Sequence, residues 1–568
     1  MKLNQLYLTE YGKRFIDEIP LKPIYNEFHL KDEYVTMRDG TRLLCTTAFP
    51  VGEYKSLPVI LLRTPYGIKS LRFFFEMSFY GYICVAQCCR GTYGSEGSWV
   101  PAKNEENDGE DTLEYIINSP WCNGKIAMTG TSYLSMNQWI LADKLPAEVK
   151  TLNIEAYSPY RYDLLYTNRM FHLEAYTGWT AYNSGVENTA FKGDRLYDEI
   201  LKFKPQIKMD EALLGEKLPW YRNWVESFKG DEEFWEKDDW GKLKNMPQSL
   251  NVPTLFNAGW YDPHFDGMFK AWNNLKEEVR GKNLFLTAPV NHKQSMCGSF
   301  PVENAFEYIG TRFMKAKLLW FNHFLRGEKL ELPQGVQMSF IYGKNTWEDV
   351  EKEKNNELER VLYFNLKECK LDNIPVDEYH EPVCFVYNPN NPAPTCGSEV
   401  IMTDYMYHKN KLTAEGIQIL PPVGAREDVV SLLSNKFEED ILLVNDFWVY
   451  IDVQTTAKDT AFTAKLALVN KNGDAYSLRS SISSVLAQHH NYMPNTTVSL
   501  KIRLTKLHVL VRKGERLRLD ISSSDYPAFH IHPNTNESWA REENYVTAKQ
   551  SIIGGKLKFS CIEKELNK

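Results

Sequence analysis

Residues 125–135 read KIAMTGTSYLS, and this stretch decides the fold. Its first part, Lys125–Thr129, predicts a buried strand, and the residues after the turn predict a helix through Trp139. Ser132 lies on the turn between them, with Gly130 two residues before it. A serine in this position is typical of a nucleophile elbow, in which the backbone of the nucleophile is strained. The usual glycine two residues after the serine is Leu134, so the motif alone is incomplete.

Two earlier apolar runs place this elbow in a parallel sheet. Leu57–Arg63 and Tyr82–Ala86 predict buried strands, and Asp108–Asn118 predicts a helix capped by Asp108. A strand, a helix and a strand at this spacing are typical of a parallel sheet with crossover helices.

The strand pattern stops after the elbow and then returns. Residues 160–246 are rich in aromatic side chains, including Trp179, and indicate a mostly helical insertion. Strands are predicted again at Val252–Gly259 and Asn283–Thr287, and residues 310–327 predict an amphipathic helix that ends at Gly327. A sheet that is interrupted and resumed in this way is one domain that carries a cap.

The last third of the chain has a different period. Segments such as Phe447–Val453 and Glu515–Ile521 alternate apolar and polar residues, and Asn472-Gly473 is a hairpin signal. We therefore predict an α/β fold with an antiparallel β-sandwich at its C-terminal end. The predicted boundaries are 1–159 and 250–350 for the split α/β domain, 160–249 for the helical cap and 355–568 for the β-sandwich.

Composition narrows the classes of partner. The 568 residues are 43% hydrophobic and 25% charged, which is typical of a globular chain. The net charge of −8 argues against nucleic acid or an anionic membrane as the main partner. No apolar stretch has the length of a signal peptide or a membrane span, and ten cysteines are too few for a disulfide scaffold. We expect a cytoplasmic protein, and a homo-oligomer stays open.

Cofactor motifs are missing from the sequence. The glycines near the elbow do not have phosphate-loop spacing, and Gly91, Gly94 and Gly97 do not form the dinucleotide fingerprint. The histidines have no HExxH arrangement and no cysteine partners. We predict neither a cofactor nor a bound metal.

A base and an acid for Ser132 follow later strands. Asp262 comes after the strand Pro253–Asn257, and His292 comes after the strand Leu284–Thr287. A serine nucleophile needs a histidine base that a carboxylate orients, and on such sheets the chain order is serine, acid, histidine. Ser132, Asp262 and His292 have this order at the carboxyl ends of three predicted strands.

The oxyanion of such a reaction needs two hydrogen-bond donors. The backbone N–H of Tyr133 directly follows the nucleophile, and the phenol of Tyr66 follows the strand Leu57–Arg63. The Tyr66 phenol could supply the second donor, or it could be an ordinary aromatic residue of a turn.

At these residues the sequence resembles the cocaine esterase and Xaa-Pro dipeptidyl-peptidase (CocE/NonD) family of α/β-hydrolases. The resemblance runs in matching order through nearly the whole chain. The matching stretches are Arg63-Thr64-Pro65-Tyr66, Arg90–Gly97, Gly130-Thr131-Ser132-Tyr133, Gly259-Trp260-Tyr261-Asp262, Pro289–His292, Tyr387–Thr395, Asp459–Leu466 and Ser522–Thr535.

The resemblance implies an α/β-hydrolase core, an inserted helical cap and a C-terminal jelly roll. It also implies that Ser132 is the nucleophile, His292 the base and Asp262 its orienting acid. By the same match, the Tyr66 phenol and the backbone N–H of Tyr133 would form the oxyanion hole. Two positions depart from the family pattern, because Ser135 and Ala288 replace glycines. Both residues are small, so we expect the elbow and the histidine loop to survive.

The resemblance is less informative about the substrate, which we expect to be a small ester or amide. The α-amino-acid ester hydrolases of the family carry acidic residues two and three positions after the catalytic aspartate, where this chain has His264 and Phe265. We therefore expect a neutral or aromatic acyl group, with these two side chains as possible pocket walls. The alternatives are an Xaa-Pro dipeptidyl-peptidase, an acylase for β-lactams or amino-acid esters, and a catalytically silent relative that binds through its β-sandwich.

Overall fold

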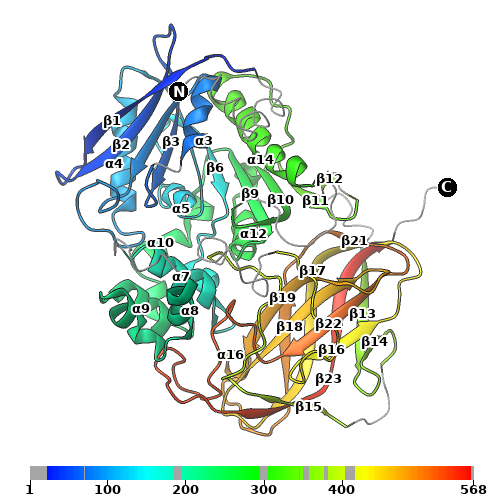
Figure 1. The fold of residues 1–568 in the computed structure, drawn as a ribbon. Helices are drawn as coiled ribbons and strands as arrows, with labels where there is room; N and C mark the ends of the chain where they lie inside the picture. Colours follow the sequence, from blue (N-terminus) through cyan, green and yellow to red (C-terminus); the bar gives the residue numbers. More distant parts are fainter. Residues whose placement is uncertain are drawn as a thin grey trace.

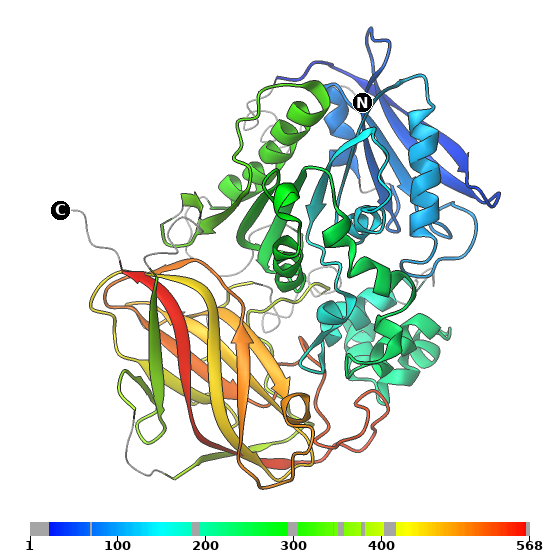
Figure 2. The same cartoon turned by 180° about the vertical axis from the view of Figure 1, so that it is seen from behind.

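The computed structural model describes residues 22–68, 71–184, 194–293, 305–344, 346–349, 357–375, 381–402 and 416–563. The predicted N-terminal extension therefore lies in part outside the described residues. Figure 1 shows an α/β domain in blue to green, a group of teal helices below it and a β-rich domain in yellow to red. Figure 2 shows the same three parts from behind.

The α/β domain is built on a ten-stranded sheet. From β4 to β11 in sheet order the strands are parallel, and β1, β2 and β12 add antiparallel edges. The sheet order is β1 (Phe28–Thr36), β2 (Arg42–Pro50), β4 (Ile83–Cys88), β3 (Leu57–Thr64), β5 (Cys122–Thr131), β6 (Val149–Glu155), β9 (Thr254–Tyr261), β10 (Leu284–Asn291), β11 (Val336–Ile341) and β12 (Thr346–Asp349). The predicted parallel sheet with an interruption after β6 is confirmed.

Helices cover the central strands, which explains why these strands are buried throughout and mostly apolar. Every residue of β4, β9 and β10 is buried. The covering helices are α3 (Arg72–Glu76), α4 (Glu105–Ile117), α5 (Tyr133–Trp139), α12 (Phe265–Asn273), α13 (Glu277–Arg280) and α14 (Ala305–Phe321). The predicted stop at Gly327 is confirmed, because a turn of π-helix at Asn322–Arg326 ends there with a φ of 76°.

The cap prediction for Asp108 is wrong. Helix α4 begins at Glu105, with Asn104 at its N-cap, so Asp108 lies inside the first turn. The Asp108 carboxylate instead accepts hydrogen bonds from Arg90 at 2.6 and 3.0 Å. The acidic residues of the first turn still favour this helix end electrostatically.

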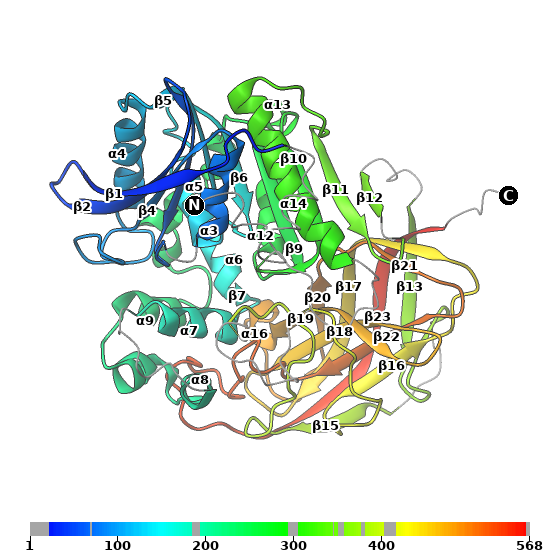
Figure 3. The same ribbon diagram turned by 45° about the horizontal axis from the view of Figure 1, so that its top comes forward.

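The insertion between β6 and β9 is helical, as predicted. Its helices are α6 (Arg161–Leu165), α7 (Leu173–Tyr182), α8 (Asp194–Lys202), α9 (Pro219–Glu226), α10 (Asp238–Leu243) and α11 (Met246–Ser249), with one hairpin of β7 (Tyr166–Thr167) and β8 (Met170–Phe171). Figures 1 and 3 both show α7, α8 and α9 together below the α/β domain and beside the β-rich domain. This position makes the insertion a cap at the junction of the two domains.

The C-terminal domain is an eleven-stranded sheet that bends over on itself around an apolar core. The predicted hairpin at Asn472-Gly473 is confirmed, since it joins β18 and β19. One pair, β14 with β16, is parallel, so the sheet is not entirely antiparallel. Its strands are β13 (Leu358–Asn365), β14 (Lys370–Asp372), β15 (Val383–Tyr387), β16 (Val430–Ser434), β17 (Ile441–Thr455), β18 (Ala461–Val469), β19 (Ala475–Ser484), β20 (Val498–Leu504), β21 (Val509–Val511), β22 (Arg516–Ser522) and β23 (Ala548–Glu563), with the short helix α16 (Val485–Gln488) after β19.

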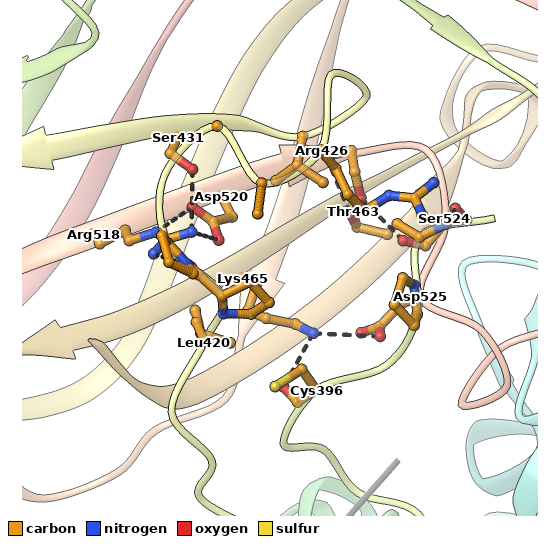
Figure 4. A pocket seen from close by; sticks show the side chains of 18 residues that line it. Cys396, Leu420, Arg426, Ser431, Thr463, Lys465, Arg518, Asp520, Ser524 and Asp525 are labelled. Carbon is orange, nitrogen blue, oxygen red and sulfur yellow. Dashed lines mark hydrogen bonds and ion pairs between the residues drawn. The ribbon is translucent and has the colours of Figure 1, made fainter. Parts of the chain in front are cut away.

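Charged side chains on the outer face of β18 and β22 line a pocket in this domain. Figure 4 shows Arg518 bound to Asp520 and Lys465 directed at Asp525. Arg518 donates to the Asp520 carboxylate at 2.7 and 2.9 Å, and the Lys465 Nζ is 3.3 Å from the Asp525 Oδ1. These charged groups are largely buried and lie in pairs of opposite sign. Pairing is expected, because an unpaired charge in a low-dielectric interior is costly.

None of the helices in the described part of the chain combines the length and apolarity needed to cross a membrane.

Four buried histidines predict that the fold is sensitive to acid. Burial lowers the pKa of His172, His264 and His508 to about 3, and it lowers the pKa of His530 well below its ordinary value. Unfolding lets these rings bind protons near pH 6.5, whereas the folded protein excludes protons from His172, His264 and His508 until about pH 3 and also holds the pKa of His530 far below 6.5. Above about pH 6.5 the buried neutral rings therefore cost the folded protein nothing. As the pH falls below that value, the free energy of unfolding decreases by about 1.4 kcal/mol per pH unit for each ring.

Urea unfolding at pH 7.5 and pH 5.0 measures this effect. We expect a clearly lower midpoint at pH 5.0. His508→Gln should reduce the difference between the two midpoints, and replacement of the exposed His490 by Gln should leave it unchanged. Equal midpoints in the wild-type protein would contradict the prediction.

Candidate active site

The turn that carries Ser132 has a strained backbone. Ser132 lies between β5 and α5 with a φ of 63° and a ψ of −127°. Residues other than glycine avoid this backbone region. Gly130 has a φ of 145°, and a Cβ built on it would lie 2.3 Å from the Cβ of Leu134. The chain therefore needs glycine before the serine, and Leu134 occupies the space that this glycine leaves.

Ser135 fastens the elbow to two strands. Its hydroxyl donates to the carbonyl of Gly130 at 2.5 Å and accepts from the backbone N–H of Glu155 at 2.8 Å. The hydroxyl is fully buried. A serine in place of the family's glycine thus adds a link between β5, β6 and α5. The second departure, Ala288, lies within β10 opposite Gly259 and is also buried.

A buried ion pair lies beneath the elbow. The Glu155 carboxylate accepts from the Lys317 Nζ at 3.0 Å, from the Asn257 Nδ2 at 2.7 Å and from the Thr131 hydroxyl at 3.1 Å. These partners come from β5, β9 and α14. The network links the carboxyl ends of β5, β6 and β9 to α14. It is costly to break, because removal of one partner would leave an uncompensated buried charge.

His292 and Asp262 meet at the carboxyl ends of β10 and β9. The His292 Nδ1 is 3.1 Å from the Asp262 Oδ1, and the two side chains are 8% and 1% exposed. The same oxygen accepts from the backbone N–H of His264 at 2.9 Å. Burial opposes ionisation of Asp262, but His292 and His264 outweigh it and hold the pKa of this carboxyl below its ordinary value. The aspartate is thus an ionised acceptor that orients the imidazole.

His264 lies against the imidazole of His292. Their ring centroids are 5.1 Å apart at 26°, and the His264 Nδ1 is 3.4 Å from the backbone N of Ser158. Burial lowers the pKa of His264 to about 3, so this ring is neutral at physiological pH. It can pack on His292 and hold its orientation, but it is too weak a base to take a proton.

Asp262, His264 and His292 are also the one group of described residues whose ligand atoms lie close enough to hold a metal ion, within 4.8 Å of one another. In the structure the His292 Nδ1 and the Asp262 Oδ1 are instead joined to each other by a hydrogen bond. The arrangement therefore fits an acid and base pair better than a resident metal.

Tyr133 is anchored by its side chain. Its phenol donates to the Glu105 Oε1 at 2.9 Å and accepts from the backbone N–H of Ala102 at 2.9 Å. Glu105 in turn pairs with the buried Arg63, 2.9 Å away. Tyr133 is the first residue of α5, where backbone N–H groups have no acceptor within the helix. The network thus fixes a free N–H directly after Ser132.

Tyr66 follows β3 at the same edge of the sheet and is half-buried. Its hydroxyl accepts a hydrogen bond of 2.9 Å from the indole N–H of Trp179 in the cap. The ring of Trp179 also stacks on that of Tyr133, with centroids 6.2 Å apart and a 20° angle. Trp179 of the cap therefore contacts both residues that are predicted to supply the oxyanion donors.

Phe265 lies at the junction with the β-rich domain. Its ring packs on Phe269 at 5.8 Å, and the guanidinium of Arg479 in β19 lies 5.1 Å from its centroid. The neighbouring Asp266 faces Arg503 at 3.5 Å. The His264 ring thus lies against the acid and base pair, whereas Phe265 contacts Asp262 through its backbone, with its N–H 2.9 Å from the Asp262 carbonyl, and its ring packs on Phe269 and Arg479.

Sequence reasoning missed several residues that support the site. Trp179 was one member of an aromatic-rich segment, and Glu155, Lys317 and Glu105 have no motif of their own. The density of tryptophans in the insertion is the signal that could have pointed to Trp179.

Family models match both folded units. A model for the X-Pro dipeptidyl-peptidase (S15 family) matches residues 39–294, and one for the X-Pro dipeptidyl-peptidase C-terminal non-catalytic domain matches residues 391–558. The chain belongs to the cocaine esterase and Xaa-Pro dipeptidyl-peptidase family of α/β-hydrolases. It is a serine hydrolase.

Relatives agree with this assignment over almost the full length. Cocaine esterase of Rhodococcus sp. strain MB1 Bresler is 25% identical, with 92% of this chain and 95% of that protein covered. Two crystal structures share the fold across 96% of this chain and 98% of theirs. They are an aminopeptidase from a marine sediment Thaumarchaeota archaeon (18% identity, TM-score 0.81) and an α-amino acid ester hydrolase (19% identity, TM-score 0.79).

The strained turn predicts that Ser132 costs the protein stability. Ser132→Gly should relieve the strain, whereas Ser132→Ala should keep it. The relief of about 1–3 kcal/mol is partly offset by the greater freedom of glycine in the unfolded chain. We expect Ser132→Gly to be about 1 kcal/mol more stable than Ser132→Ala in urea unfolding. A glycine variant no more stable than the alanine variant would show that the turn is unstrained.

Proposed function

We propose that the protein hydrolyses carboxylic esters through an acyl-enzyme intermediate on Ser132. The observation that carries this proposal is the Asp262–His292 pair, which lies at the same edge of the sheet as a serine in strained backbone. Ser132 itself is half-buried. A nucleophile, a base and an orienting acid are the three groups that this chemistry requires.

The proposed reaction has two halves. In the first, the Ser132 Oγ attacks the carbonyl carbon while His292 takes the hydroxyl proton. The C–O bond to the leaving group then breaks, and His292 returns the proton to the departing alcohol. In the second half, a water molecule attacks the acyl-enzyme, gives its proton to His292 and releases the carboxylic acid, and Ser132 is reprotonated. Asp262 stabilises the imidazolium in both halves.

The oxyanion of each tetrahedral intermediate would receive two hydrogen bonds, from the backbone N–H of Tyr133 and the phenol of Tyr66. The anchoring of the Tyr133 side chain supports the first donor, and the fixed contact to Trp179 supports the second. Donors held in place before the reaction stabilise developing charge without reorganisation.

The surroundings favour an uncharged acyl group. Three half-buried tryptophans, Trp99, Trp179 and Trp220, gather beside Tyr133 with ring centroids 5.6–6.2 Å apart. His264 is neutral, and Asp266 already faces Arg503. We propose that the aromatic side chains bind the acyl group and that His264 supports His292. Phe265 would act indirectly, through its contact with Arg479.

A second candidate is the cleavage of amides or amino-acyl esters. It is favoured by the family description of an X-Pro dipeptidyl-peptidase and by the structural similarity to an α-amino acid ester hydrolase. The same groups would act, with an amine as the leaving group. A catalytically silent relative is not supported, because the family assignment indicates a serine hydrolase.

A matched pair of esters tests the substrate class. We expect a higher kcat/KM for p-nitrophenyl propionate than for the glycine p-nitrophenyl ester, which replaces a methyl group by an ammonium group. The expected difference is at least about tenfold, because the carboxylates of Asp262 and Asp266, which lie near the site in the described part of the chain, already face His292 and Arg503. Ser132→Ala should abolish both activities. Preference for the glycine ester, or faster cleavage of an Xaa-Pro-p-nitroanilide or a β-lactam amide, would favour the second candidate instead.

A further inference from the structure

One hydrogen bond crosses from the cap to the predicted oxyanion hole. The indole N–H of Trp179, in α7, donates to the phenol oxygen of Tyr66 at 2.9 Å, although the two residues are 113 positions apart. An indole N–H can only donate, so the phenol oxygen is the acceptor in this bond. The Trp179 bond does not use the proton of the Tyr66 hydroxyl, which must point away from the indole N–H.

The same helix makes two more contacts with the oxyanion hole. The ring of Trp179 stacks on Tyr133, which carries the other donor. The ring of Tyr182, the last residue of α7, lies 6.4 Å from that of Tyr66. Helix α7 therefore touches both residues that the proposed function assigns to the oxyanion.

The direction of a phenolic O–H is set by what the oxygen accepts. A phenol without a fixed donor can rotate its proton toward other acceptors, including water. When the oxygen already accepts a bond, that direction is occupied, and the bond also polarises the O–H and strengthens its donation. Oxyanion donors work best when such orientation exists before the substrate arrives.

We propose that Trp179 is a positioning residue that orients the phenolic proton of Tyr66 toward the oxyanion. The cap thereby completes the oxyanion hole, besides covering the site. This inference rests on the oxyanion role proposed for Tyr66. It concerns Trp179 as a donor, which differs from a role of its ring as a wall for the acyl group.

Kinetics of Trp179→Phe test the donor. This change keeps an aromatic ring and removes the N–H. We expect kcat for a p-nitrophenyl ester to fall about tenfold, the value of one neutral hydrogen bond, with KM within about a factor of two. Trp224→Phe is the matched control, because Trp224 packs 5.9 Å from Trp179 and its buried Nε1 has no partner in the described part of the chain. It should leave kcat within about a factor of two.

A double-mutant cycle separates positioning from packing. Tyr66→Phe alone should lower kcat by about 10²–10³. In that background Trp179→Phe should cause no further loss, because the group that it orients is gone. Losses that multiply would show that Trp179 acts through packing, which would overturn the inference while the role of Tyr66 stands. An unchanged kcat in Tyr66→Phe would instead remove the oxyanion role, and the inference with it.

An isosteric replacement guards against failure to fold. Replacing Trp179 with 3-benzothienylalanine exchanges the N–H for sulfur and keeps the shape of the ring. It should reproduce the loss in kcat seen with phenylalanine. A benzothienyl variant with full kcat would overturn the inference, since only the donor has been removed.

Discussion

The strained turn at Ser132 is the constraint on which the rest of the structure depends. A serine with a φ of 63° persists only where its surroundings leave no alternative. Gly130 and Leu134 fill the turn, Ser135 ties it to β5 and β6, and Glu155 with Lys317 holds the strands beneath it. These contacts explain why the family's glycine can be a serine here without loss of the elbow.

Each of the other two units supports a part of the site. In the cap, α7 reaches Tyr66 through Trp179. The β-rich domain reaches α7, where Glu174 accepts from the backbone N–H of Ile401 at 2.8 Å. It also reaches the end of β9, where Arg479 donates to the carbonyl of Trp260. A domain whose family description calls it non-catalytic thus contacts both the cap helix and the strand end before Asp262.

Much of this fold could be predicted from local patterns. The buried strands were recognisable because both faces are covered, and the hairpin at Asn472-Gly473 because its turn requires a positive φ. The start of α4 was misplaced because several acidic residues compete for its first turn. The placement of Ser132, Asp262 and His292 at the ends of strands followed from chain order, but their roles stay predictions.

Contacts between distant segments could not be predicted. Nothing in the sequence shows that Trp179 would meet Tyr66, or that Lys317 would pair with Glu155, because these contacts depend on how helices pack over the sheet. For the same reason, the contact between the Phe265 ring and Arg479 of the β-rich domain could not be predicted, and the role of Phe265 as a pocket wall stays a prediction.

The central claim is that Ser132 forms a covalent acyl-enzyme. Rapid acid quenching during turnover of a p-nitrophenyl ester, followed by trypsin digestion and mass spectrometry, tests it directly. The account predicts an acyl adduct on the peptide 126–144, which lies between Lys125 and Lys144, with fragment ions that place it on Ser132. Turnover without any adduct, or an adduct on another residue, would contradict it.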